Sequence, residues 1–229
     1  MLLESLGNVS NALGNFPKAR DYLNQALTIH REIGNRSSEA SALASLGEVL
    51  SLVGKPDSAR LTVSRSLKIY RETGDKFFEG IMLLQISELL YDRTRINEAL
   101  DTLREARSIL AGIGDTQNVL LTDTWIGLAT ARTGHLGFDR HQLASLDSSF
   151  GSVQKGATFL KFAWNLYELN TLLGQNEKAR YYLQQAQIEL DKRAQKLADE
   201  SVRKAYLTNV PLNRNIVNAW QRINSRRVH

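Results

Sequence analysis

The sequence contains no cysteine and only three prolines among its 229 residues. Without cysteine the chain has no disulfide framework and no thiol nucleophile. The few prolines and the absence of low-complexity tracts argue against long disordered regions. No run approaches the roughly 18 consecutive apolar residues of a membrane span, and the first residues, MLLES, lack the basic and long apolar parts of a signal peptide. We therefore expect a globular cytoplasmic protein.

Charge is spread unevenly along the chain. The net charge is +5, but residues 177–229 hold 11 Lys and Arg against 5 Asp and Glu, whereas residues 1–176 hold 18 against 19. The basic excess therefore belongs to the C-terminal end, which disfavours a nucleic-acid-binding face along the whole chain. A nucleic-acid-binding module at the basic end stays as an alternative.

The sequence repeats with a period of 40 residues. Glycines recur in one register at 14, 54, 134 and 174, and Thr94 fills the missing position. Three further columns follow the same period: Ala19, Ala59, Ala99 and Ala179; Leu23, Val63, Leu103, Leu143 and Leu183; and Leu6, Leu46, Ile86, Ile126 and Leu166. Columns held in register along the chain indicate a repeat architecture.

Each unit has the pattern of two helices. Apolar residues recur at spacings of three and four, as in Leu43, Leu46 and Leu50. In Gly54-Lys55-Pro56-Asp57 the glycine suits the left-handed end of one helix, and the proline suits the first turn of the next. Gly34-Asn35 and Gly74-Asp75 end the second helices in the same way. Short loops make the paired helices antiparallel.

The repeat columns resemble the tetratricopeptide repeat. Leu6-Gly7 and Leu46-Gly47 match its first-helix signature, and Ala19/Leu23/Ala26 matches its second-helix signature. The second signature returns in Ala59/Val63/Ser66, Ala99/Leu103/Ala106 and Ala179/Leu183/Ala186. The resemblance covers about residues 1–195, and the long repeat is similar to arrays in bacterial signal-transduction ATPases, cyclases and transcriptional regulators.

The resemblance implies an all-α fold, a right-handed α-α superhelix. We expect five helix pairs over residues 1–198 and capping helices over 199–229. The fourth pair is irregular, because Asp139 and Leu146 replace small residues and DSSFGS at 147–152 ends the helix early. Near the C-terminus, Asp199 should open a short helix, Pro211 should follow its end, and Asn213 should cap the last helix.

Residues for catalysis or metal binding are lacking. His30 falls in a packing column, and His135 and His141 have no cysteine to complete a zinc site. The sequence has no HExxH, P-loop or GxSxG motif, and SVQK at 152–155 matches SxxK without its companion motifs. We expect no enzyme activity, no cofactor and no metal.

The partner site is carried over from the resemblance, which implies that the first helices line a concave groove. The groove is polar at its N-terminal end, with Glu4, Asn11 and Ser41, and apolar in its middle. The predicted partner-binding residues are Ile81, Leu84, Glu88, Tyr91, Leu121, Leu128, Lys161, Trp164 and Glu168. The alternative is that Ile81, Leu84 and Leu121 pack between repeats.

The predicted function is a non-catalytic scaffold or sensor module that binds a protein or peptide. We expect it to serve a larger bacterial signalling protein and to follow further repeats, since Met1 falls inside a helix. A peptide-pheromone receptor, with asparagines holding the ligand backbone, is the first alternative, and the nucleic-acid module is the second. We expect no membrane partner.

Overall fold

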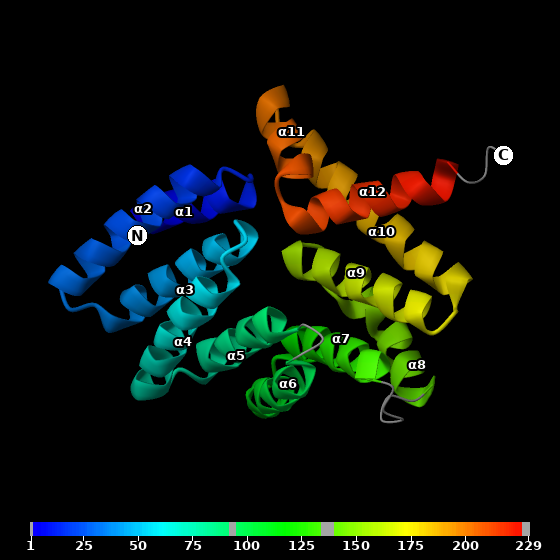
Figure 1. The fold of residues 1–229 in the computed structure, drawn as a ribbon, viewed down its shortest axis with the longest axis horizontal. Helices are drawn as coiled ribbons and strands as arrows, with labels where there is room; N and C mark the ends of the chain where they lie inside the picture. The colour runs from blue at the N-terminus through cyan, green and yellow to red at the C-terminus, as the bar shows by residue number, and fades with distance from the viewer. Residues whose placement is uncertain (1, 92–94, 134–139, 226–229) are drawn as a thin grey trace. The chain divides into compact units, whose positions relative to one another are not determined.

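Most of the residues that the structure describes lie in helices. The computed structural model describes residues 2–91, 95–133 and 140–225 (Figure 1). Over these ranges it has twelve α-helices, a 3-10 turn at Phe150–Ser152 and no strand. The α-helices are α1 (Leu2–Ala12), α2 (Phe16–Glu32), α3 (Arg36–Leu52), α4 (Pro56–Thr73), α5 (Lys76–Leu90), α6 (Ile96–Gly112), α7 (Thr116–Thr133), α8 (Arg140–Ser149), α9 (Ala157–Leu172), α10 (Asn176–Gln195), α11 (Glu200–Thr208) and α12 (Pro211–Ser225). The predicted all-α fold class is confirmed.

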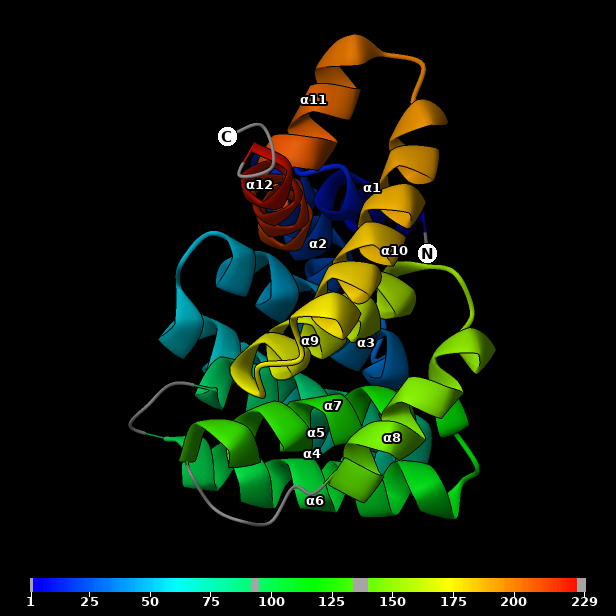
Figure 2. The same cartoon turned by 90° about the vertical axis from the view of Figure 1, so that its right-hand side faces the viewer.

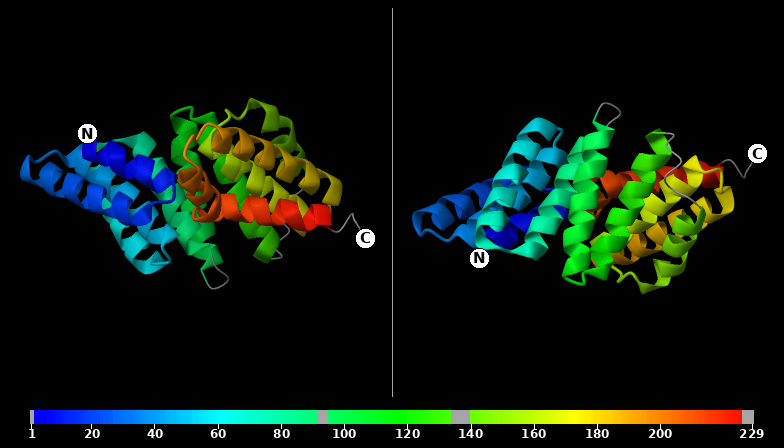
Figure 3. Two further views of the ribbon diagram at one scale, coloured as in Figure 1. Left: turned by 90° about the horizontal axis from the view of Figure 1, so that it is seen from above. Right: turned by 90° about the horizontal axis from the view of Figure 1, so that it is seen from below.

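The chain forms two units, Met1–Ile113 and Gly114–His229, called unit 1 and unit 2 below. In unit 1 each of the helices α1 to α6 packs on the next, so the helix pairs follow one another in chain order (Figure 3). In unit 2, α7 packs on α8 and α9, α9 packs on α10, and α12 packs on α10 and α11 (Figure 2). Residue 198, the predicted boundary of the repeat array, lies between α10 and α11; that boundary stays a prediction.

Helix ends follow the local chemistry of the glycine loops. Gly34, Gly54 and Gly74 have φ of 68°, 77° and 75°, which confirms the predicted left-handed conformation. After Gly34 and Gly74 the next residue also caps the following helix: the side chain of Asn35 accepts a hydrogen bond from the backbone N–H of Ser38 at 3.1 Å, and Asp75 does the same for Phe78 at 3.1 Å. These two loops therefore satisfy backbone groups on both sides, whereas Lys55 after Gly54 makes no side-chain capping bond.

The small residues of the repeat lie where two helices of a pair meet. A methyl group added to Gly7 would come within 2.7 Å of the Leu23 side chain, and one added to Gly47 would overlap Val63. The carbonyl oxygen of Ala59 would lie 3.4 Å from the same added atom of Gly47. The Leu-Gly signature of the first helix and the Ala-Leu signature of the second helix therefore describe the two sides of one contact. The two helices approach closely there because the residues at the crossing have small side chains.

Ala59→Leu is the test of this close approach. Ala59 is fully buried, so the larger side chain has to push α3 and α4 apart. We expect the free energy of unfolding to fall by about 1–3 kcal/mol, measured by thermal or urea denaturation. Thr62→Leu, at a more accessible position on the same helix, is the control and should change stability little. An unchanged melting temperature for Ala59→Leu would contradict the assigned contact.

The C-terminal helices give one confirmation and one correction, whereas the irregular fourth helix pair stays a prediction. The helix α8 has 10 residues, against 17, 18, 17 and 20 in α2, α4, α6 and α10, but residues 134–139 before it lie outside the described ranges. Asp199 caps α11 as predicted, accepting from the backbone N–H of Val202 at 3.0 Å. The prediction that Asn213 caps α12 is wrong: this helix begins at Pro211, and the buried Asn213 amide donates to the Tyr206 carbonyl at 2.9 Å. Thr94, Gly134, His135 and Asp139 lie outside the described residues.

Two buried glutamates recur with the repeat period. Glu39 accepts hydrogen bonds from Arg31 at 2.9 Å and from Arg36 at 2.6 Å. Forty residues later, Glu79 accepts from Arg71 at 3.0 Å and from Lys76 at 2.7 Å. Burial alone would raise the pKa of Glu79, but its hydrogen bonds to Lys76 and Arg71 outweigh burial and hold the pKa below its ordinary value. Arg31 and Arg71 thereby join the end of one repeat to the start of the next.

Candidate partner-binding surface

The predicted site residues come from three first helices, which belong to different units. In unit 1, α5 carries Ile81, Leu84, Glu88 and, directly after the helix, Tyr91. Leu84 is buried, whereas Ile81, Glu88 and Tyr91 are half-buried. Buried positions cover most of this helix because it packs against both α4 and α6. In unit 1 the exposed part of the predicted site is therefore reduced to Ile81, Glu88 and Tyr91.

In unit 2, the α7 part of the predicted site is buried. Leu121 and Leu128 are 3% and 0% exposed. Thr124, between them, is also buried, and its hydroxyl accepts a hydrogen bond from the Asn165 amide of α9 at 3.0 Å. Leu121 and Leu128, like Leu84, are thus core residues in this structure, as the packing alternative held for Leu84 and Leu121. They offer no surface to a partner.

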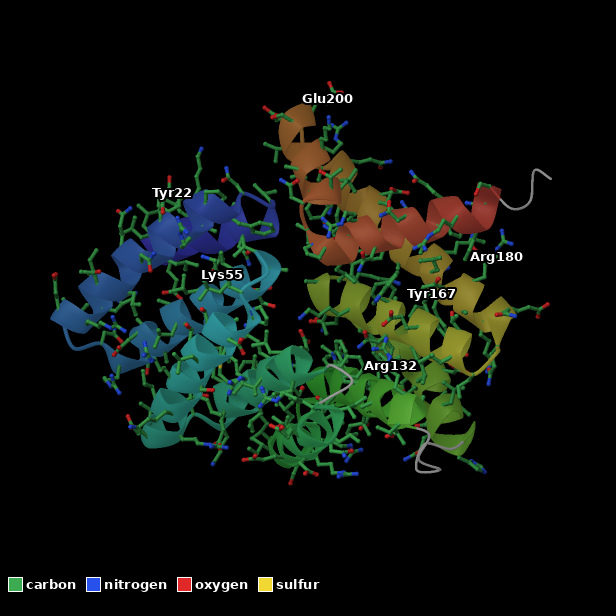
Figure 4. All side chains as sticks on the ribbon, viewed as in Figure 1. Tyr22, Lys55, Arg132, Tyr167, Arg180 and Glu200 are labelled. Atoms are coloured by element: carbon green, nitrogen blue, oxygen red, sulfur yellow. The ribbon has the colours of Figure 1, made fainter. Side chains whose placement is uncertain are left out.

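In unit 2 the helix α9 carries the predicted site residues that remain accessible. Lys161, Trp164 and Glu168, called the α9 stripe, are half-buried and spaced three and four residues apart, so they share one side of the helix. The Trp164 ring lies against Tyr167, with centroids 5.1 Å apart and planes tilted by 52°. Figure 4 shows Tyr167 on α9 and Arg132 on the neighbouring α7. Tyr167 and Arg132 were not among the predicted site residues.

Glu168 is electrostatically unusual for an accessible glutamate. Burial raises the pKa of its carboxyl group, and this outweighs the opposite effects of Arg132 and of a hydrogen bond with Trp164. The charge of Arg132 and the hydrogen bond with Trp164 thus do not fully compensate the carboxyl group for its partial burial. Perturbed carboxyl groups of this kind are more frequent at functional sites than elsewhere.

Glu168→Gln should raise stability at neutral pH. Because the pKa of Glu168 is raised in the folded state, its ionised form destabilises the fold above that pKa, and the penalty is absent below the ordinary glutamate pKa of about 4.3. The glutamine keeps an oxygen that can accept from Trp164 but carries no charge. We expect a higher melting temperature for the variant at pH 7 and no difference near pH 4. Glu200→Gln, on an exposed residue, is the control; a melting temperature lowered by Glu168→Gln at pH 7 would contradict the argument.

The polar N-terminal end of unit 1 is partly used by the fold itself. The Ser41 hydroxyl donates to the carboxylate of Glu4, and the ring Nε2 of the buried His30 lies 3.5 Å from the other oxygen of Glu4. Beside them, burial raises the pKa of Tyr70 to about 12. Asn11 is buried as well. Glu4, Ser41 and His30 therefore link α1, α3 and α2, and the packing role predicted for His30 is confirmed.

Several basic residues near the C-terminal end have partners within unit 2. Lys178 lies 2.5 Å from Asp147, Arg193 lies 3.5 Å from Glu189, and Arg203 donates to the Leu197 carbonyl at 2.7 Å. These contacts account for part of the basic excess without a nucleic acid. Among the described residues, no group of three or more His, Asp or Glu is placed to hold a metal ion. No helix among them is long and apolar enough to cross a membrane.

Comparisons with known proteins agree with this fold. Residues 1–72 match the family model described as tetratricopeptide repeat. Two solved structures cover 98% of the chain: the Rap conjugation gene regulator of plasmid pLS20 in complex with the Phr* peptide, with a TM-score of 0.68 and 16% identity, and a Rap protein complexed with Competence and Sporulation Factor, with 0.63 and 14%. The chain spans 62% and 63% of those two proteins.

A third structure has nearly the length of this chain. It contains the nearly identical TPR-like repeats of a putative kinesin light chain from Podosopora anserina, with a TM-score of 0.59 and 14% identity, covering 84% of this chain and 95% of that one. No curated protein matches the chain. The resemblance to the tetratricopeptide repeat is thereby confirmed over residues 1–72, and the solved structures show the same helical-repeat fold for most of the chain.

Proposed function

We propose that the chain is a non-catalytic cytoplasmic module of a larger signalling protein, and that it binds a protein or peptide on the exposed sides of its first helices. The α9 stripe is the observation that carries this proposal. Trp164 is a large ring left half-buried in the middle of a helix where Phe162, Ala163 and Leu166 beside it are fully buried. Binding surfaces are enriched in accessible aromatic side chains of this kind.

The charges beside Trp164 favour a peptide or helix over a purely apolar ligand. Lys161 and Glu168 flank the ring on the same side of α9, so a partner that covers Trp164 also meets one charge of each sign. An amphipathic helix or an extended peptide with apolar anchors provides both kinds of contact. The two Rap structures, solved with a peptide or factor bound, support a peptide partner for this fold. In unit 1, we propose that the partner binds at the half-buried residues Ile81, Glu88 and Tyr91.

Truncating the aromatic side chains tests the proposal. A partner is first isolated by affinity capture with the full chain, and its affinity for the variants is then measured by calorimetry. We expect Trp164→Ala and Tyr91→Ala each to weaken binding by about 2 kcal/mol, roughly thirtyfold in Kd. Leu84→Ala would act through folding instead, because Leu84 is buried.

Asn8→Ala is the matched control for binding, since Asn8 is exposed on the first helix of unit 1. Glu4 and Asn11 are unsuitable controls because they contribute to packing. Circular dichroism must show that each variant keeps its helical content. If Asn8→Ala loses binding while both aromatic variants retain it, the partner binds elsewhere and the proposal fails.

A further inference from the structure

Two aromatic rings and a carboxyl group meet on one side of α9. The rings of Trp164 and Tyr167 are in contact, with centroids 5.1 Å apart and planes tilted by 52°. Glu168 follows Tyr167 in the chain and lies one helical turn after Trp164, whose indole N–H donates a hydrogen bond to the Glu168 carboxyl group. All three residues are half-buried, so each keeps a part open to solvent. We call them the ring–carboxylate site.

The protein compensates the Glu168 carboxylate only in part. Burial raises the pKa of this group by more than Arg132 of α7 and the Trp164 hydrogen bond lower it. Glu39 and Glu79 are the opposite case in the same chain: burial acts to raise the pKa of each, but the two cationic side chains that donate to each of them lower it. A further cation beside Glu168 would stabilise its ionised form in the same way.

The rings add a second attraction for a cation. The faces of tryptophan and tyrosine rings attract positive charge, and arginine occupies them more often than lysine. A guanidinium group is flat, so it can stack on a ring and donate to a nearby carboxylate at the same time. An apolar side chain would cover the rings but would bury the carboxylate further without a donor, which costs free energy. Arginine therefore suits every part of the ring–carboxylate site.

We propose that the ring–carboxylate site receives an arginine side chain of the partner, stacked on Trp164 and donating to Glu168. This names the partner chemistry for the α9 stripe and rests on the function proposed above. Arg132 is no obstacle, since Glu39 shows that one carboxylate of this chain can accept from two arginines, at 2.9 and 2.6 Å. The proposal also gives a reason for the stability cost expected of Glu168, because the charge of the partner removes that cost on binding.

Two small probes that differ in charge test the proposal on the full chain. Acetyl-arginine amide carries the guanidinium group, whereas acetyl-citrulline amide has a neutral group of nearly the same shape. Binding is followed by the indole N–H resonance of Trp164 in NMR spectra, which is assigned with Trp164→Phe. We expect the arginine probe to shift this resonance saturably and to bind at least about tenfold tighter than the citrulline probe, because only arginine offers cationic donors and a cation–π contact. Equal affinities for the two probes, or no saturable shift with arginine, overturn the proposal.

Glu168→Gln separates the charge of the site from folding. The variant keeps the size of the side chain and is expected to stabilise the fold at pH 7, so a loss of binding cannot come from unfolding. We expect its affinity for the arginine probe to fall about tenfold. Glu200→Gln, at an exposed position outside the site, is the control and should change the affinity less than about twofold. If Glu168→Gln binds the arginine probe as tightly as the wild type does, the proposal is overturned.

The captured partner distinguishes this proposal from the function on which it rests. If Trp164→Ala and Glu168→Gln both weaken binding of the partner, both proposals are supported. If Trp164→Ala weakens it and Glu168→Gln does not, the partner covers α9 without an arginine at Glu168, and only the present proposal is overturned. If neither variant weakens it, the function proposed for the α9 stripe fails, and the present proposal fails with it.

Discussion

Val49→Asp is expected to lower the free energy of unfolding by about 3–5 kcal/mol, which is the cost of an unpaired buried charge. Val49 is 1% exposed and packs against Ala19 and Leu23. None of its cluster neighbours Ala19, Leu23, Phe16 and Leu46 can hydrogen-bond a carboxylate through its side chain, so the introduced group must ionise unpaired, take up a proton or force the helices apart. Each outcome disrupts the α2–α3 contact and with it the stacking of the first two helix pairs.

The matched control is Val9→Asp, which makes the same substitution at the corresponding position of the preceding repeat. Val9 is 56% exposed, so we expect a loss of less than about 1 kcal/mol, mainly from helix propensity. Urea denaturation should be followed by far-ultraviolet circular dichroism, because all three tryptophans, at 125, 164 and 220, lie in unit 2. If both variants lost the same free energy of unfolding, this would contradict the burial of Val49 on α3 and the exposure of Val9 on α1.

The helix boundaries could be predicted because they depend on neighbouring residues. Glycine tolerates the left-handed conformation, and the Asn or Asp that follows can accept from a backbone N–H three residues ahead. Gly34-Asn35 and Gly74-Asp75 contain both features within two residues. Asn213 shows the limit of this reasoning: Pro211 also starts a helix, and the amide of Asn213 instead satisfies a carbonyl of the preceding helix.

The exposure of the predicted site residues could not be read from the sequence, because the repeat register does not determine how much of a helix its neighbours cover. Leu121, Thr124 and Leu128 occupy the same columns as Lys161, Trp164 and Glu168. The first three are buried and the second three are half-buried. Periodicity therefore identifies the side of the helix, but exposure depends on neighbouring helices whose lengths and packing differ between repeats.

The ion pairs of Glu39 with Arg31 and of Glu79 with Arg71 were not predicted because they do not follow the i,i+3 or i,i+4 spacing of pairs within one helix. Arg31 and Arg71 stand eight residues before the glutamates they bind, across a helix boundary. Arg71 also reaches Glu105, 34 residues further along the chain, at 2.6 Å. The sequence shows that Arg31 and Arg71 share one position of the repeat and that Glu39 and Glu79 share another. Only the structure shows that the arginine at the first position contacts the glutamate at the second.

Removing both cations from Glu79 is expected to cost about 2–3 kcal/mol at pH 7. In the double variant Arg71→Ala and Lys76→Ala, the nearly buried carboxylate loses both of its hydrogen-bond donors. The loss should fall somewhat below the ~3–5 kcal/mol typical of fully buried pairs, because Arg71 and Lys76 are themselves 45% and 60% exposed. Urea denaturation at pH 7 measures it. Arg104→Ala, which breaks an exposed ion pair with Asp101, is the control and should cost less than about 0.5 kcal/mol.

The pH dependence and a third substitution identify the cause of the loss. In the wild type the lowered pKa of Glu79 means that its pairing stabilises the fold above the unfolded pKa of about 4.3, and this contribution disappears as pH falls through the folded pKa. In the double variant burial dominates and the pKa of Glu79 is raised, so its penalty is present at neutral pH and absent below about pH 4. The difference between the two proteins should therefore shrink on acidification. Adding Glu79→Leu to the double variant should recover most of the loss at pH 7, since an apolar side chain needs no cation. A loss that persists after this third change, or one that is independent of pH, would mean that Arg71 and Lys76 act through packing and not through their charge.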